Sequence, residues 1–150
     1  GLVSKAILED GGAYDISVTP PDPDATPPRS PWQGKTLEEI MALGREQSPR
    51  WAEEEFAPWA QAKLDLRPAA LAVMAKPRPP WREAFSRVRC PLLLIYADNA
   101  LGSIVTPESA AEAARLNPMV RLVHIPGAGH NVRREAFPAF LEAVRAFLAG

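Results

Sequence analysis

The sequence predicts an α/β fold that is built on a parallel sheet. Three short apolar runs, over residues 3–10, 91–97 and 120–125, have the length of strands. The second run is continuously apolar, as in strands that helices cover on both faces of a parallel sheet. Helical patterns over residues 106–116 and 134–148 follow the second and third runs. This strand–helix order implies right-handed parallel crossovers.

Between the first two strands the sequence predicts a helical insertion over residues 36–86. Thr36 and Glu39 have the spacing of a capping box, which opens a helix towards Leu43. Ser48-Pro49 predicts a second helix that runs to Leu64, with a kink or a split at Pro58. A third helix is expected from Leu66 to Ala75.

The domain boundaries follow from these elements. We expect residues 1–11 and 89–150 to form the core, and residues 12–88 to form a helical cap. The stretch 20–31 holds six of the 17 prolines and is interpreted as a linker, with a loop beside a pocket as the alternative.

Composition excludes several classes of function. The chain has 150 residues, 47% of them hydrophobic and 23% charged, which is typical of a globular domain. The net charge of −1 gives no basis for a nucleic-acid partner, and no apolar run approaches the length of a membrane span. One cysteine and two histidines without ligand spacing predict no metal, and no phosphate loop or other cofactor motif is present. With no signal-like N-terminus, a cytoplasmic location is expected.

Polar residues follow each predicted strand at its carboxyl end. Asp10 comes after the first strand, Asp98 after the second and His130 shortly after the third. Ligands of parallel α/β sheets bind outside the carboxyl ends of the strands. We therefore expect these three side chains to converge on one edge of the sheet.

Three segments carry a resemblance to a known superfamily: Glu9-Asp10 after a strand, the run from Arg89 to Asp98 with Thr106-Pro107-Glu108 beyond it, and Ile125-Pro126-Gly127-Ala128-Gly129-His130. Together they resemble the C-terminal part of the α/β-hydrolases, in particular the small cap-bearing members such as esterases and C–C bond hydrolases. The likeness covers the sheet-forming ends of the chain well and the cap hardly at all.

The resemblance implies roles for these residues. His130 matches the histidine that serves as general base, whose imidazole can take a proton from a nucleophile near neutral pH. Asp98 would be the acid that orients it. Many relatives carry the acid at the place of Ser103, whereas others carry it after the earlier strand, so Asp10 is the alternative. His124 lies within a strand and is interpreted as a packed or surface residue.

The resemblance also implies a nucleophile that the sequence does not contain. None of the seven serines has the Gly-x-Ser-x-Gly surroundings of a nucleophile elbow, and Cys90 precedes its strand at the opposite edge of the sheet. We therefore expect a preceding segment or a partner chain to complete the sheet and the site. The expected function is a hydrolase of an ester, a C–C bond or another activated carbonyl. The alternative is a non-catalytic, hydrolase-like binding module.

Aromatic residues of the insertion are the candidates for substrate contacts. Trp51, Phe56 and Trp59 have helical spacing, which is more often found in a core. If the insertion is a cap, these rings would favour an apolar small-molecule substrate.

Overall fold

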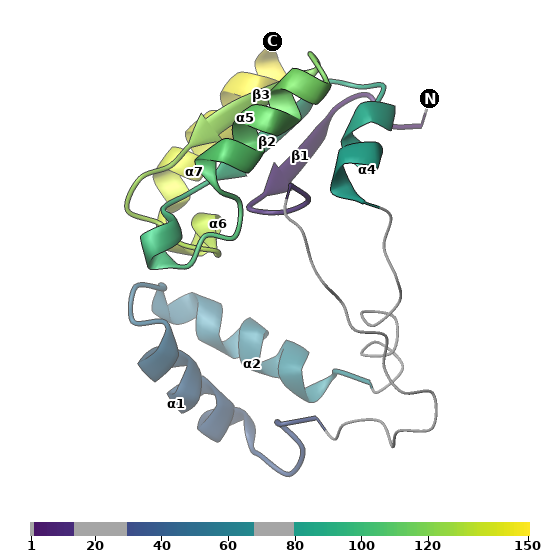
Figure 1. Ribbon diagram of the computed structural model, residues 1–150. Coiled ribbons are helices and arrows are strands. Elements are labelled where there is room, and N and C mark those ends of the chain that lie inside the picture. Colours follow the sequence, from purple (N-terminus) through teal and green to yellow (C-terminus); the bar gives the residue numbers. More distant parts are fainter. Residues whose placement is uncertain (1, 14–29, 68–79) are drawn as a thin grey trace, which may run out of the picture. The chain divides into compact units, whose positions relative to one another are not determined.

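The computed structural model describes residues 2–13, 30–67 and 80–150. The chain divides into two compact units, residues 1–16 with 79–150 and residues 17–78. The first holds the sheet, and the second holds helices of the insertion (Figure 1). Among the described residues, no helix has both the length and the apolar character that crossing a membrane requires.

The sheet is parallel, as the sequence predicts. It consists of β1 (Ala6–Glu9), β2 (Leu92–Tyr96) and β3 (Val120–His124), in the order β1-β2-β3. Leu94 in the central strand is opposite Leu8 on one side and Leu122 on the other. The three strands therefore end at the same edge of the sheet, which is where the candidate residues begin.

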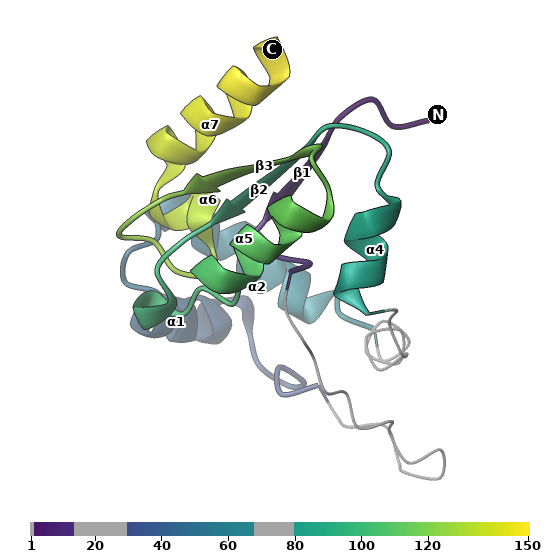
Figure 2. The same cartoon turned by 45° about the horizontal axis from the view of Figure 1, so that its top comes forward.

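Helices cover both faces of this sheet. On one face α4 (Trp81–Arg87) and α5 (Pro107–Leu116) pack against a buried cluster that includes Leu92 and Leu94. On the other face α6 (Val132–Glu135) and α7 (Phe137–Ala149) pack against a second cluster that includes Leu93 and Ile95 (Figure 2). Alternate residues of β2 point to opposite faces, so its continuously apolar sequence follows from burial on both sides.

The position of helix α4 differs from what the expected domain boundary implies. Residues 81–88 were expected to belong to the cap, but α4 packs on the sheet unit. Trp81 and Phe85 are buried in the cluster on the α5 face, and Arg82 forms an ion pair with Glu112 of α5. The amide of Asn117 also donates to the Phe85 carbonyl oxygen at 2.8 Å. The insertion therefore ends before α4, and this helix supports the sheet.

The C-terminal helix also differs from the expectation of one helix over residues 134–148. The structure has two helices, α6 and α7, which meet at Ala136, whose φ is −143° and ψ 52°. Pro138 fits the break because it lacks the N–H that a continuous helix would use and lies in the first turn of α7, where proline is tolerated.

The helical unit contains α1 (Leu37–Gln47), a 3-10 turn η1 (Glu53–Glu55) and α2 (Phe56–Leu64). The capping box is present: Thr36 Oγ1 accepts the N–H of Glu39, whose carboxylate accepts the N–H of Thr36 at 2.7 Å. This backbone N–H, with the Thr36 hydroxyl, lowers the pKa of Glu39. The expected kink at Pro58 is absent, because α2 begins only at Phe56 and Pro58 lies in its first turn, where proline is tolerated.

Two expectations from the sequence concern residues that the structure largely does not describe. The proline-rich stretch 20–31, except its last two residues, and the helix expected over 66–75, except its first two, lie outside the described residues.

Candidate active site

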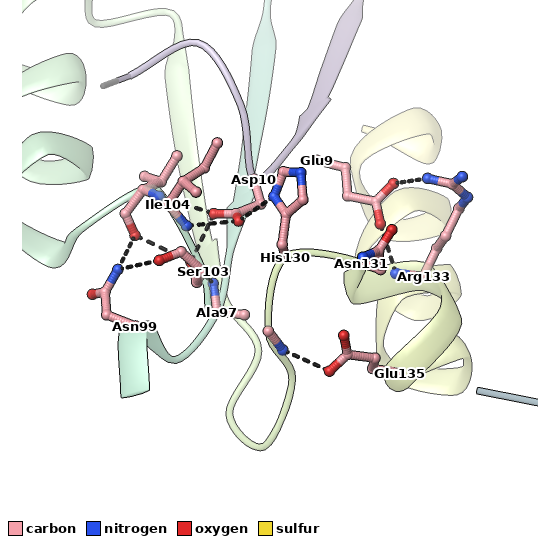
Figure 3. A network of polar contacts seen from close by, with 12 residues as sticks. Glu9, Asp10, Ala97, Asn99, Ser103, Ile104, His130, Asn131, Arg133 and Glu135 are labelled. Atoms are coloured by element: carbon pink, nitrogen blue, oxygen red, sulfur yellow. Dashed lines mark hydrogen bonds and ion pairs between the residues drawn. The ribbon is translucent and has the colours of Figure 1, made fainter. Parts of the chain in front are cut away.

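The site is built at the carboxyl edge of the sheet. Asp10 directly follows β1, and His130 comes from the loop that joins β3 to α6 (Figure 3). The structure brings these two side chains together: Nδ1 of His130 lies 2.9 Å from Oδ2 of Asp10. Asp98, which follows β2, is not part of this pair.

Asp10 is fully buried and surrounded by donors. Oδ1 accepts the hydroxyl of Ser103 at 2.7 Å and the N–H of Val105 at 3.0 Å. Oδ2 accepts the N–H of Ile104 at 2.9 Å and faces the His130 ring. A carboxylate only accepts hydrogen bonds, so this set of donors fits an ionised side chain and compensates for its burial.

The backbone at Asp10 explains how its side chain reaches the site. Asp10 has a φ of +41° and is the only residue besides glycine with a positive φ among the described residues. Its N–H still bonds the carbonyl of Ile95 at 2.7 Å, which fixes it to the end of β2. Aspartate adopts the left-handed region more readily than most residues. The chain thus turns sharply at the end of β1 and directs the carboxylate towards the next loop.

His130 is exposed at its outer side, with 53% of its side chain accessible. Because Asp10 accepts from Nδ1, the neutral ring carries its proton there and leaves Nε2 as a base. Nε2 has no hydrogen-bond partner among the described residues. In this tautomer Nε2 carries the lone pair that can accept a proton.

The loop between β2 and α5 delivers the donors for Asp10. It contains the 3-10 turn η2 (Asn99–Leu101) and then Gly102, whose φ of +99° reverses the chain. The Asn99 amide donates to the carbonyl of Ser103 at 2.7 Å. These contacts hold residues 103–105 with their donors facing Asp10.

The loop that carries His130 is packed closely on η2. A Cβ built on Gly129 would lie 2.1 Å from the carbonyl oxygen of Leu101, so only glycine fits there. The N–H of Gly129 donates to Glu135 at 2.9 Å. Behind the loop, Glu9 accepts the N–H of Arg133 at 2.8 Å and pairs with its guanidinium at 2.5 Å. The loop is therefore packed on η2, and helix α6, which follows it, is held to the end of β1.

Asp98 does not orient His130, which corrects the first choice of the sequence analysis. Its Oδ1 lies 2.8 Å from Nε2 of His124, and its Oδ2 accepts the N–H of Gly127 at 2.7 Å. These two contacts, the Gly127 N–H first, lower the pKa of Asp98. His124 ends β3 next to Tyr96, with ring centroids 5.0 Å apart, and 41% of its side chain is exposed. The carboxylate of Asp98 thus contacts His124 of the neighbouring strand, and Asp10 is the carboxylate that contacts His130.

The aromatic residues proposed as substrate contacts lie in the helical unit. Trp51 stacks on Phe56 with centroids 5.9 Å apart, and it meets Trp59 edge to face at 6.0 Å. Phe56 is buried, and Gly44 of α1 packs against both Phe56 and Trp59. Phe56 therefore belongs to the core of this unit, whereas Trp51 and Trp59 are half-buried.

Sequence reasoning missed the supporting residues Glu9, Arg133 and Glu135. No motif marks them, although Glu9 precedes Asp10 and the other two lie within five residues of His130. Ser103 carried a signal in the resemblance, which puts it at the place where many relatives carry the acid. In the structure its hydroxyl donates to Asp10 at 2.7 Å.

Several solved structures have folds similar to that of this chain, three of which follow. An E-2-(acetamidomethylene)succinate hydrolase has a TM-score of 0.64 and 22% identity, over 76% of this chain and 46% of its own. The N-formylmaleamic acid deformylase of Pseudomonas putida has a TM-score of 0.65 and 20% identity, over 95% and 56%. A thermophilic esterase from Thermogutta terrifontis has a TM-score of 0.53 and 25% identity, over 75% and 47%.

These similarities show the fold. The neighbours are α/β-hydrolases, and the chain has the C-terminal part of the α/β-hydrolase fold, as the sequence predicts. The chain spans about half the length of these structures, 46% to 56% of each. No protein-family model and no curated protein sequence matches the chain.

Proposed function

We propose that this chain supplies the base and the acid of a hydrolase that cleaves an ester or another activated carbonyl bond, C–C bonds included. The observation that carries the proposal is the pair of buried Asp10 and exposed His130, joined at 2.9 Å through Nδ1. Nε2 of His130 would take the proton of a nucleophile and return it to the leaving group. Asp10 would hold the ring in the required tautomer and stabilise the imidazolium.

The nucleophile in this proposal comes from outside the 150 residues. The serines of the sequence lack the surroundings of a nucleophile elbow, and the chain spans only 46% and 56% of the length of two of its fold neighbours. Ser103 is the serine nearest to the pair, but it is buried and its hydroxyl donates to Asp10 at 2.7 Å. A preceding segment or a partner chain would therefore bring the attacking group to Nε2.

The substrate in this proposal is a small molecule with an apolar part. Leu101 and Ile104 support it, because these apolar residues are 43% and 38% exposed and belong to the loop that supplies donors for Asp10.

The test is turnover of p-nitrophenyl acetate by the complete protein, with its nucleophile present. His130→Ala should lower kcat by roughly three powers of ten or more, as expected for loss of the base. Glu142→Ala, an exposed change on α7, is the control and should stay within about twofold of wild type, like other surface substitutions. Activity of His130→Ala within about tenfold of wild type would remove His130 from the mechanism and favour the non-catalytic alternative.

A further inference from the structure

Asp98 contacts the loop that carries His130 at two successive residues. Its Oδ2 accepts the N–H of Gly127 at 2.7 Å, and its own N–H donates to the carbonyl of Ala128 at 3.0 Å. Gly127 has a φ of +79°, so the loop makes its turn at the residue that Asp98 holds. His130 follows three residues later.

Asp98 also holds the opposite side of the site. Its carbonyl oxygen accepts the N–H of Leu101 at 2.9 Å and that of Ser103 at 3.2 Å. The Leu101 carbonyl is the surface on which Gly129 packs, and the Ser103 hydroxyl donates to Asp10. One residue at the end of β2 is thus bonded to the segment that carries the base and to the segment that supports the acid.

His124 supports the carboxylate of Asp98 from β3. Its Nε2 lies 2.8 Å from Oδ1, and its ring lies against Tyr96 of β2. The end of each of these strands therefore contributes one member of a second carboxylate–imidazole pair. Among the described residues, no hydrogen bond or ion pair joins Asp98 to the side chain of Asp10 or His130, so its effect on them runs through the two loops.

We infer that Asp98, which is held by His124, is a positioning residue that fixes the location of His130 relative to Asp10. The catalytic part of this inference rests on the proposed function. The distinction from a triad acid is chemical. An acid must carry charge to stabilise an imidazolium, whereas a positioning residue needs only an acceptor for Gly127 and a partner for His124.

An amide meets the second requirement and not the first. In Asp98→Asn the remaining oxygen can accept the Gly127 N–H, and the NH₂ group can donate to Nε2 of a neutral His124. In Asp98→Ala both contacts are lost. The two variants therefore separate a loss of geometry from a loss of charge.

The experiment measures kcat and KM for p-nitrophenyl acetate with the complete protein. Asp98→Ala should lower kcat by about 100-fold with KM within about twofold, as a displaced base costs rate more than binding. Asp98→Asn should stay within about tenfold of wild type, whereas Asp10→Asn should lose about four powers of ten. The inference is overturned if Asp98→Ala stays within about twofold of wild type, or if Asp98→Asn is as slow as Asp10→Asn.

A second readout does not depend on catalysis. In ¹H–¹⁵N NMR spectra, Asp98→Ala should shift the amide signals of Gly127, Gly129 and Ser103, and Asp98→Asn should shift them less. If His130→Ala leaves turnover unchanged, the proposed function fails. The amide signals still show in that case whether Asp98 positions the two loops. Unchanged amide signals in Asp98→Ala would overturn the inference whatever the activity.

Discussion

Replacing Asp10 by asparagine tests the acid of the proposed pair by its effect on stability. The wild-type carboxylate accepts the N–H groups of Ile104 and Val105, the Ser103 hydroxyl and the ring of His130, and it is fully buried. Asparagine tolerates the φ of +41° at this position, so the substitution adds little backbone strain. The effect should therefore come from hydrogen bonding and charge.

The geometry fixes which way the new amide turns. Its NH₂ group must replace either Oδ1, which faces the N–H of Val105, or Oδ2, which faces the N–H of Ile104 and His130. The second orientation costs less, because the imidazole can change tautomer and accept at Nδ1. The Ile104 N–H then loses its acceptor, and Nε2 becomes protonated and cannot act as a base.

The expected loss is roughly 2–3 kcal/mol in the free energy of unfolding. A hydrogen bond to a charged group contributes about 1.5–3 kcal/mol, and a donor left unpaired costs about 1–3 kcal/mol. Urea denaturation of the complete protein measures it, with Asp65→Asn as the control. Asp65 is exposed at the end of α2, where its carboxylate accepts from Gln61, so that change should cost less than about 0.5 kcal/mol. Equal, small losses in both variants would refute the burial and bonding argument for Asp10.

Two further predictions concern the His130 loop. Gly129→Ala should lower stability by about 1–3 kcal/mol, since its Cβ would lie 2.1 Å from the carbonyl oxygen of Leu101, and unchanged urea denaturation would contradict that close approach. His124→Phe should raise the pKa of Asp98 towards its ordinary value, as followed by ¹³C NMR of the carboxyl group, because it removes a partner that lowers this pKa. The stabilisation from the Asp98 contacts is present above its unfolded pKa and is lost as pH falls through the lower folded value. Wild type should therefore lose more stability in acid than the variant, and the same acid dependence in both would reject the contribution of His124.

The sequence predicted the sheet because its local signals agree with the tertiary environment. The apolar run of β2 is buried on both faces, and the cap at Thr106 with Pro107 starts α5 where expected. The last helix was predicted too long because the apolar periodicity continues across Pro138, although the backbone cannot.

The choice between Asp10 and Asp98 could not be made from local sequence. Both follow a strand at the same edge, so position alone does not distinguish them. The structure separates them by two tertiary facts: His124 on the neighbouring strand binds Asp98, and the turn at Gly102 directs residues 103–105 towards Asp10. Neither feature can be recognised from the residues that are close in sequence to Asp10 or Asp98. The position of His130 at this edge was predictable because its glycine-bearing loop is a local motif.

The most direct test of the account is a double-mutant cycle on kcat/KM for p-nitrophenyl acetate. It compares His130→Ala, Asp10→Asn and the double variant in the complete protein. Residues that act as one unit show strongly non-additive effects. Because Asp10 is proposed to act only through the imidazole of His130, adding Asp10→Asn to His130→Ala should change kcat/KM by less than about threefold. Multiplicative losses, with the double variant slower than His130→Ala by the full factor of Asp10→Asn, would contradict the central claim that the two residues form one catalytic pair.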